Sequence, residues 1–157
     1  MKSRHPELAD APPSNAFECR DRIRWADSDP MGIIFYGAYI RLIGVAESEM
    51  SRACGLPVDE LRFERGVWIP RKALHLDFHS AAELEEEVLI QSWFSRIGTT
   101  AITMRFEFYR ASDRMHRASG SLTVVSVERD VMKPRPIPDD VKQLLRRFAS
   151  QRPGTSD

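Results

Sequence analysis

The sequence predicts an α+β domain in which an antiparallel sheet wraps around one long central helix. Several short segments place apolar residues at every second position, which is typical of half-buried strands. In another segment, between Gly37 and Gly55, apolar residues recur at intervals of three and four, which predicts a helix. Further apolar residues extend that face almost all the way round the helix. A helix of that kind has to be enclosed by other structure. Because strands precede and follow it, we expect one sheet to curl about it, with the help of a second copy of the chain.

The first strand is expected between residues 17 and 25, where one face is apolar and the other charged; the apolar face is Phe17, Cys19, Ile23 and Trp25. It stops at Asp27–Pro30, because Asp, Ser and Pro favour a turn. The helix follows and ends at Gly55–Pro57, with glycine and then proline after its last turn.

Alternation returns in the second half of the chain and predicts four more strands. A short last helix opens at Pro138, whose fixed φ suits a first helical turn. In order, these elements are expected at residues 74–79, 88–95, 102–108, 121–127 and 138–148.

Composition excludes several classes of protein. The 157 residues carry 23 basic and 23 acidic side chains, so no long-range field would gather nucleic acid or an anionic membrane. Two cysteines make neither a disulfide framework nor a zinc site. With no signal peptide and no membrane-spanning stretch, we expect a cytoplasmic protein. Residues 1–16 and 150–157 are predicted to be flexible tails around one domain, residues 17–149.

The segment Asp27–Tyr39 is the best candidate for a chemical site. It places two aspartates on a turn just before a helix entrance, where unpaired backbone N–H groups and the helix dipole favour negative charge. A carboxylate there can attack a carbonyl or activate water. Aspartate before proline and glycine is also an ordinary turn residue, so both interpretations stay open at this point.

The same segment resembles the helix-entry motif of hot-dog-fold acyl-CoA thioesterases, in the branch of 4-hydroxybenzoyl-CoA thioesterases and the small thioesterases associated with Tol-Pal genes. The resemblance continues at Glu49–Met50, Gly66–Val67, Asp77–Phe78, Ser80–Val88 and Lys133–Pro138, and so covers most of the chain in order. It implies a hot-dog fold, a homodimer or homotetramer, an acyl-CoA substrate, and neither a metal nor an organic cofactor.

Carried over residue by residue, the resemblance puts the catalytic carboxylate on Asp29, as nucleophile or general base. It puts the oxyanion-binding backbone N–H at Tyr36. The substrate-binding positions that it implies are Gly32, Phe35, Gly37, Tyr39, Ile43, Gly44 and Thr99.

Three positions depart from the family pattern. Ala38 replaces a frequent Asn, Tyr36 replaces the His of the Tol-Pal branch, and Gly44 replaces an acid that faces the phenol in hydroxybenzoyl enzymes. The loss of that acid leaves room for an aryl or medium-to-long acyl group. The alternatives are a thioesterase for acyl chains on a carrier protein and a non-catalytic acyl-binding module.

Other conspicuous residues have simpler interpretations. His75 and His79 share a strand face. With a rise of about 3.3 Å per residue they lie roughly 13 Å apart, too far to bind the same metal ion. The acids at residues 83–87 predict a solvated turn. Four surface arginines are candidates for binding the phosphates of coenzyme A: Arg96, Arg110, Arg114 and Arg117. Four aromatic residues are expected to pack in the core or at a dimer interface: Trp68, Trp93, Phe106 and Phe108.

Overall fold

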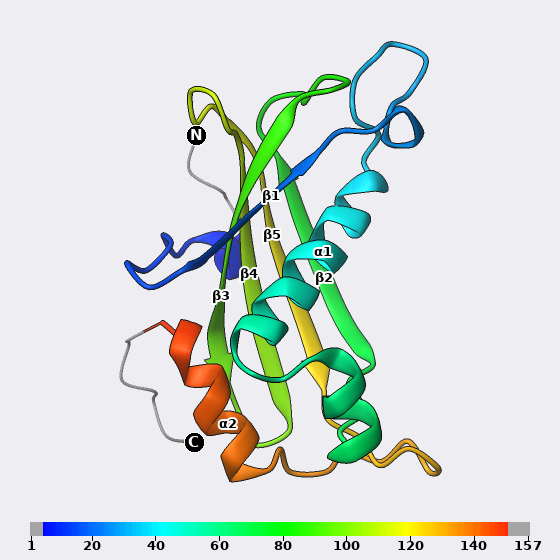
Figure 1. Ribbon diagram of the computed structural model, residues 1–157, viewed down its shortest axis with the longest axis vertical. Coiled ribbons are helices and arrows are strands. Elements are labelled where there is room, and N and C mark those ends of the chain that lie inside the picture. The colour runs from blue at the N-terminus through cyan, green and yellow to red at the C-terminus, as the bar shows by residue number, and fades with distance from the viewer. Residues whose placement is uncertain (1–4, 151–157) are drawn as a thin grey trace.

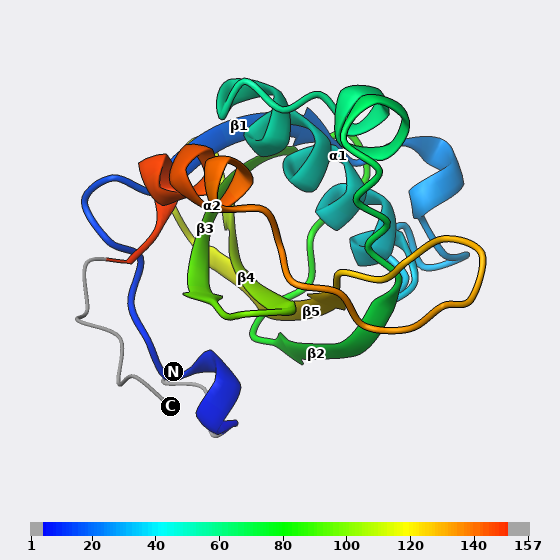
Figure 2. The ribbon, with the colours of Figure 1, turned by 90° about the horizontal axis from the view of Figure 1, so that it is seen from below.

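One antiparallel sheet carries the fold of the computed structural model, which describes residues 5–150. Its strand order is β1-β3-β4-β5-β2, and the strands are β1 (Phe17–Arg22), β2 (Arg71–Phe78), β3 (Glu87–Ile97), β4 (Ala101–Arg110) and β5 (His116–Val125). Helix α1 (Ala38–Ala53) runs along the sheet, and α2 (Asp139–Leu145) lies beside the C-terminal end of α1 (Figure 1). Seen from below, the sheet curves around these helices (Figure 2). The predicted sheet around a central helix is confirmed.

The core lies between α1 and the inner face of the sheet. Alternation turns Phe106 and Phe108 of β4 inward, where both are fully buried against a helix face that includes Leu42 and Met50. Nothing in residues 5–150 covers the opposite face of α1, where Ile40 is 58% exposed. One chain therefore encloses the helix only in part. No helix within residues 5–150 is long and apolar enough to cross a membrane.

The end of the first strand differs from the prediction. Strand β1 stops at Arg22, and Trp25–Asp27 form a single 3-10 turn that leaves Trp25 82% exposed. The backbone N–H of Arg24 donates to Asp27 Oδ2 at 2.9 Å, and that of Asp27 donates to the Arg24 carbonyl at 2.9 Å. These local hydrogen bonds outweigh the alternating pattern, so the prediction that Trp25 faces the core is wrong.

The outer face of the sheet is covered by the N-terminal segment. A 3-10 turn, Pro6–Leu8, contacts β5, and Leu8 is buried (Figure 2). His5 stacks on His75 of β2 with ring centroids 4.1 Å apart. Part of the segment predicted to be a tail therefore contacts the domain, and residues 1–4 and 151–157 lie outside the described residues.

Candidate functional site

A tight turn between β1 and α1 positions Asp29. Its backbone N–H donates to the Ile33 carbonyl at 2.8 Å, and its carbonyl accepts the Gly32 N–H at 3.0 Å. Gly32 has a φ of +77°, which glycine adopts without steric cost. The turn thus places Asp29 at the tip of a short loop whose arms pair at Ser28 and Ile34.

The two oxygens of the Asp29 carboxylate have different environments. Oδ1 accepts the backbone N–H of Met31 at 2.8 Å and, more weakly, that of Ile33 at 3.4 Å. Oδ2 has no hydrogen-bond partner in the part of the chain that the structure describes, and the residue is partly exposed. Asp29 therefore does act as a turn residue, and it keeps one oxygen for another role.

The entrance of α1 offers backbone donors. Within residues 5–150, the N–H groups of Tyr36 and Gly37 have no acceptor, because both precede the first hydrogen-bonded turn of the helix. A Cβ on Gly37 would lie 2.6 Å from the ring of Phe35, so only glycine permits this close approach. The helix dipole adds positive potential at this end, which suits an anionic oxygen.

An arginine on the first turn of α1 fixes the loop before Asp29. Arg41 Nε donates to Asp27 Oδ1 at 2.8 Å, and its Nη1 donates to Asp21 Oδ2 at 2.5 Å. Burial opposes ionisation of Asp27, but hydrogen bonds from Arg41 and Arg24 outweigh it and hold the pKa of Asp27 below its usual value. The first aspartate of the motif is thus committed to an ion pair.

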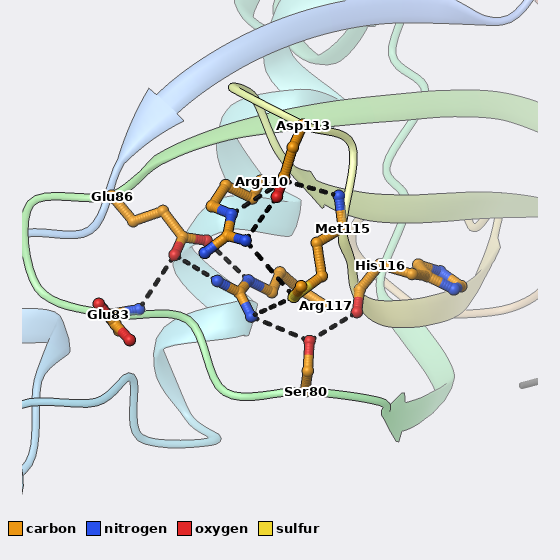
Figure 3. Close-up of polar contacts among 8 residues, drawn as sticks. All are labelled: Ser80, Glu83, Glu86, Arg110, Asp113, Met115, His116 and Arg117. Atoms are coloured by element: carbon orange, nitrogen blue, oxygen red, sulfur yellow. Dashed lines mark hydrogen bonds and ion pairs between the residues drawn. The ribbon is translucent and has the colours of Figure 1, made fainter.

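A second ion pair holds the loop between β2 and β3 (Figure 3). Arg117 donates to both carboxylate oxygens of Glu86, at 2.8 and 2.6 Å, and to Ser80 Oγ at 3.0 Å. The side chains of Arg117 and Glu86 are only 4% and 7% exposed. The prediction of a solvated turn is wrong for Glu86, and this pairing makes Arg117 unsuitable for a coenzyme A phosphate.

That loop in turn supports the Asp29 turn. The backbone N–H of Ile34 donates to the Ala82 carbonyl at 2.9 Å, and that of Leu84 to the Gly32 carbonyl at 3.1 Å. Sequence reasoning missed this role of Arg117 and Glu86. No local pattern could reveal it, because the two residues are 31 positions apart.

A cavity of about 490 Å³ lies beside the C-terminal half of α1. Gly44 is on its wall, and no atom lies within 4 Å of where a Cβ would stand. Its other walls are Glu47, Ser48, Val58, Arg62, Trp68, Ile69, Pro70, Arg71 and Met132. Burial raises the pKa of Glu47, although Arg71, whose Nη2 lies 2.6 Å from both of its oxygens, pulls it down.

The structure brings some of the predicted substrate-binding residues together and separates others. Gly32, Phe35 and Gly37 lie around the Asp29 turn, and Phe35 is 41% exposed. Tyr39 and Ile43 are buried in the core beneath it, and burial raises the pKa of Tyr39 to about 12.

Thr99 is not near the Asp29 turn. It lies between β3 and β4, at the opposite end of β3 from Glu86, and its carbonyl accepts the Ile137 N–H at 2.8 Å. Of the other candidate arginines, Arg110 pairs with Asp113 and Arg114 lies over the ring of Tyr109. Trp93, Phe106 and Phe108 are fully buried, as predicted for core residues.

Comparison with known proteins points in one direction. A sequence model of the Thioesterase-like superfamily matches residues 23–145. The chain is 23% identical over 128 residues to an acyl-CoA thioesterase, YbgC, of Haemophilus influenzae, which covers 82% of this chain and 93% of that protein.

Solved structures agree with the fold. A thioesterase-superfamily protein from Jannaschia sp. CCS1 superposes with a TM-score of 0.83 and 26% identity, over 91% of this chain and 99% of that one. The 4-hydroxybenzoyl-CoA thioesterase of Pseudomonas sp. strain CBS-3 gives a TM-score of 0.75 at 22% identity, over 82% and 98%. The fold is the hot-dog fold, as predicted.

Proposed function

The chain belongs to the thioesterase-like superfamily and is a hydrolase of acyl-CoA thioesters, and we propose that Asp29 and the entrance of α1 carry out that hydrolysis. One observation carries the proposal. Among the described residues, 5–150, one oxygen of the Asp29 carboxylate has no hydrogen bond, and two backbone N–H groups in the same short loop have no acceptor. Together they supply a nucleophile or base and an oxyanion site.

In the proposed reaction, Asp29 Oδ2 attacks the thioester carbonyl carbon or takes a proton from a water that attacks it. The carbonyl oxygen gains negative charge, which the N–H groups of Tyr36 and Gly37 stabilise. The C–S bond then breaks, and the coenzyme A sulfur leaves as the thiol once it is protonated. In the first route, water hydrolyses the resulting anhydride and restores the carboxylate.

The hydrogen bond from Met31 to Oδ1 supports this role, because it orients the carboxylate before substrate arrives. Gly32, Phe35 and Gly37 would contact the substrate, while Tyr39 and Ile43 would support these residues from the core. Gly44, with the cavity beside it, leaves room for an aryl or medium-to-long acyl group.

We also propose that the protein is a homodimer or a tetramer built from such dimers. On the side of β2 away from β5, no strand within residues 5–150 pairs with it. Ile40, Leu74 and Phe78 are 58%, 40% and 52% exposed, and an apolar surface beside an open strand edge favours a second copy. Size-exclusion chromatography with light scattering tests this; a monomer at micromolar concentration would reject it.

The catalytic proposal is tested with Asp29→Asn, which keeps the shape and removes the charge. We expect kcat for thiol release from a panel of aryl and straight-chain acyl-CoAs to fall about 10²–10⁴-fold. Asp130→Asn, in an exposed loop, is the matched control and should keep its rate.

The panel also separates the alternatives. Retained turnover in Asp29→Asn would reject the role of Asp29. Binding of acyl-CoA by the wild type without thiol release would indicate an acyl-binding module. Hydrolysis only of acyl chains on a carrier protein would move the substrate to that class.

A further inference from the structure

Two histidines meet on the outer face of the sheet, where β2 has just ended and β5 begins. The ring centroids of His79 and His116 lie 4.2 Å apart. His116 Nε2 lies 2.6 Å from Glu107 Oε2, and Glu107 points outward because Phe106 and Phe108 on either side of it point inward. At this separation, a positive charge on one imidazole opposes a positive charge on the other.

The hydrogen bonds of His79 leave no place for a second proton on its ring. Ser119 donates its one hydroxyl hydrogen to Glu107 Oε2 at 2.6 Å, so it accepts from His79 Nε2, which lies 2.9 Å from its oxygen. On the other side of the ring, Nδ1 is buried and has no hydrogen-bond partner within residues 5–150. A proton there would make a buried N–H without an acceptor, which is costly. In its present position His79 is therefore neutral.

The charges around the two histidines have the same overall effect. Burial lowers the pKa of His79 and the charge of His116 lowers it further, while Glu107 and Asp77 raise it without cancelling those effects. Arg105 already binds Glu107 at 3.1 Å, which leaves that carboxylate less able to neutralise a second imidazolium. The remaining charged or titratable side chains around this cluster in the described chain are Tyr109 and Arg114 beside His116, and Glu7 and Asp10, which act on Arg105.

The same corner of the sheet is joined to the loop that supports the Asp29 turn. The backbone N–H of His79 donates to the Arg117 carbonyl at 2.8 Å, and the hydroxyl of the next residue, Ser80, donates to the His116 carbonyl at 2.7 Å. On the inner side, Arg117 donates to Ser80 Oγ, while the ring of His116 points away from them (Figure 3). A displacement of His79 therefore displaces the start of the loop between β2 and β3.

We propose that His79 is a positioning residue for the hydrolysis: its neutral imidazole holds the loop between β2 and β3, and through it the Asp29 turn, and protonation in mild acid releases both. This role rests on the proposed function, because the turn matters to the reaction only if Asp29 acts there. His79 touches no reacting atom. It acts through the two backbone hydrogen bonds, donated by Ile34 and Leu84, that join the loop to the turn.

The size of the effect follows from the uptake of one proton. A histidine has an ordinary pKa of about 6.5, so at about pH 5.5 a released imidazole is about ten times more often charged than neutral. The held form excludes that proton, so the equilibrium shifts about tenfold toward the released form as the pH falls through this range. The ordinary pKa of an aspartate, about 3.9, lies well below it.

The test measures amide hydrogen exchange at about pH 7.5 and about pH 5.5, each corrected for the intrinsic exchange rate. In the wild type, the protection of the Ile34 and Leu84 amides should fall about tenfold. In His79→Gln, which keeps a hydrogen-bonding side chain that is never charged, protection should stay the same. His75→Gln is the matched control, because His75 lies on the same strand but stacks on His5, and it should keep the tenfold loss.

The pH profile of thiol release tests the link to the reaction. Between the same two pH values, kcat should fall severalfold in the wild type and in His75→Gln, and it should stay constant in His79→Gln. Nuclear magnetic resonance of the wild type gives a second measurement that needs no variant. The His79 ring should take up its proton over the pH range in which protection falls.

Three results would overturn this role of His79. They are a wild type whose loop and turn amides keep their protection at about pH 5.5, a loss of protection that persists in His79→Gln, and a His79 ring that titrates outside the range of the loss. If Asp29→Asn abolishes hydrolysis in the same protein, only the positioning role is rejected. A loss of protection without a loss of kcat would instead reject the role of the Asp29 turn in hydrolysis, and with it the positioning role.

Discussion

The two ends of helix α1 use arginine in opposite ways. At the N-terminal end, Arg41 binds the carboxylates of Asp21 and Asp27, and Arg117 binds Glu86 in the adjacent loop. At the C-terminal end, Arg62 and Arg129 stack on Trp68 and, within residues 5–150, pair with no carboxylate. Arginines of the first kind neutralise buried acids, whereas those of the second kind contact an aromatic ring.

The difference follows from what each end has to hold. The loop that carries Asp29 exposes large apolar side chains, among them Met31 at 82% and Tyr36 at 76%, so burial contributes little to its stability. Ion pairs and backbone hydrogen bonds hold it instead. At the other end of α1, the cavity is supported by the core between the sheet and α1. The arginines near the cavity are not part of that core. Substitution of an arginine at the N-terminal end should therefore lower the free energy of unfolding more than substitution of an arginine near the cavity.

The largest expected effect on stability is that of Arg117→Met. The change leaves Glu86 buried without a positively charged partner, which costs about 3–5 kcal/mol in the free energy of unfolding. Urea denaturation measures it. Arg110→Met is the control in the same region (Figure 3), because its pair with Asp113 is exposed and should contribute at most about 1 kcal/mol. Equal losses in the two variants would show that the buried pair has no special role.

Arg41→Ala and Arg62→Ala compare the two ends directly with the same substitution. Arg41→Ala leaves two carboxylates facing each other, and we expect a loss of about 2–3 kcal/mol, below the value for a fully buried pair because Arg41 is 29% exposed. Arg62→Ala removes partly exposed contacts with the rings of Trp68 and Phe63 and should cost less than about 1 kcal/mol. A larger loss for Arg62→Ala would contradict the comparison.

The smallest effect is a difference in pH dependence, on the order of 1 kcal/mol. The pKa of Asp27 is lowered on folding, so its contribution is complete above its unfolded pKa, about 3.9, and is lost as the pH falls through the folded value. The pKa of Glu47 is raised, so stability falls as the pH rises from about 4.3 through the folded value.

Urea midpoints measured across the acid and neutral range separate the two acids. Asp27→Asn should flatten the loss of stability below about pH 4, and Glu47→Gln should flatten the decline above about pH 4.3. If each variant changes the slope in the other's range, the assignment of the two pKa shifts is wrong.

Local patterns sufficed for much of the fold and for part of the site. Alternation at Phe106 and Phe108 and the three-and-four spacing of α1 were visible in the sequence, since each pattern spans one element. The turn at Asp29 was visible for the same reason. The prediction for Trp25 was wrong because hydrogen bonds with Asp27 end the strand, although the alternating pattern continues to Trp25.

Short-range periodicity and turn chemistry were enough to predict the sheet, the central helix and the position of Asp29 before the helix entrance. The pairing of charges could not be predicted in this way, because it depends on contacts between distant segments. Asp21 and Arg41 are 20 positions apart and Glu86 and Arg117 are 31 apart, and whether a guanidinium meets a carboxylate, an aromatic ring or an open cavity depends on which strands and loops the fold brings together.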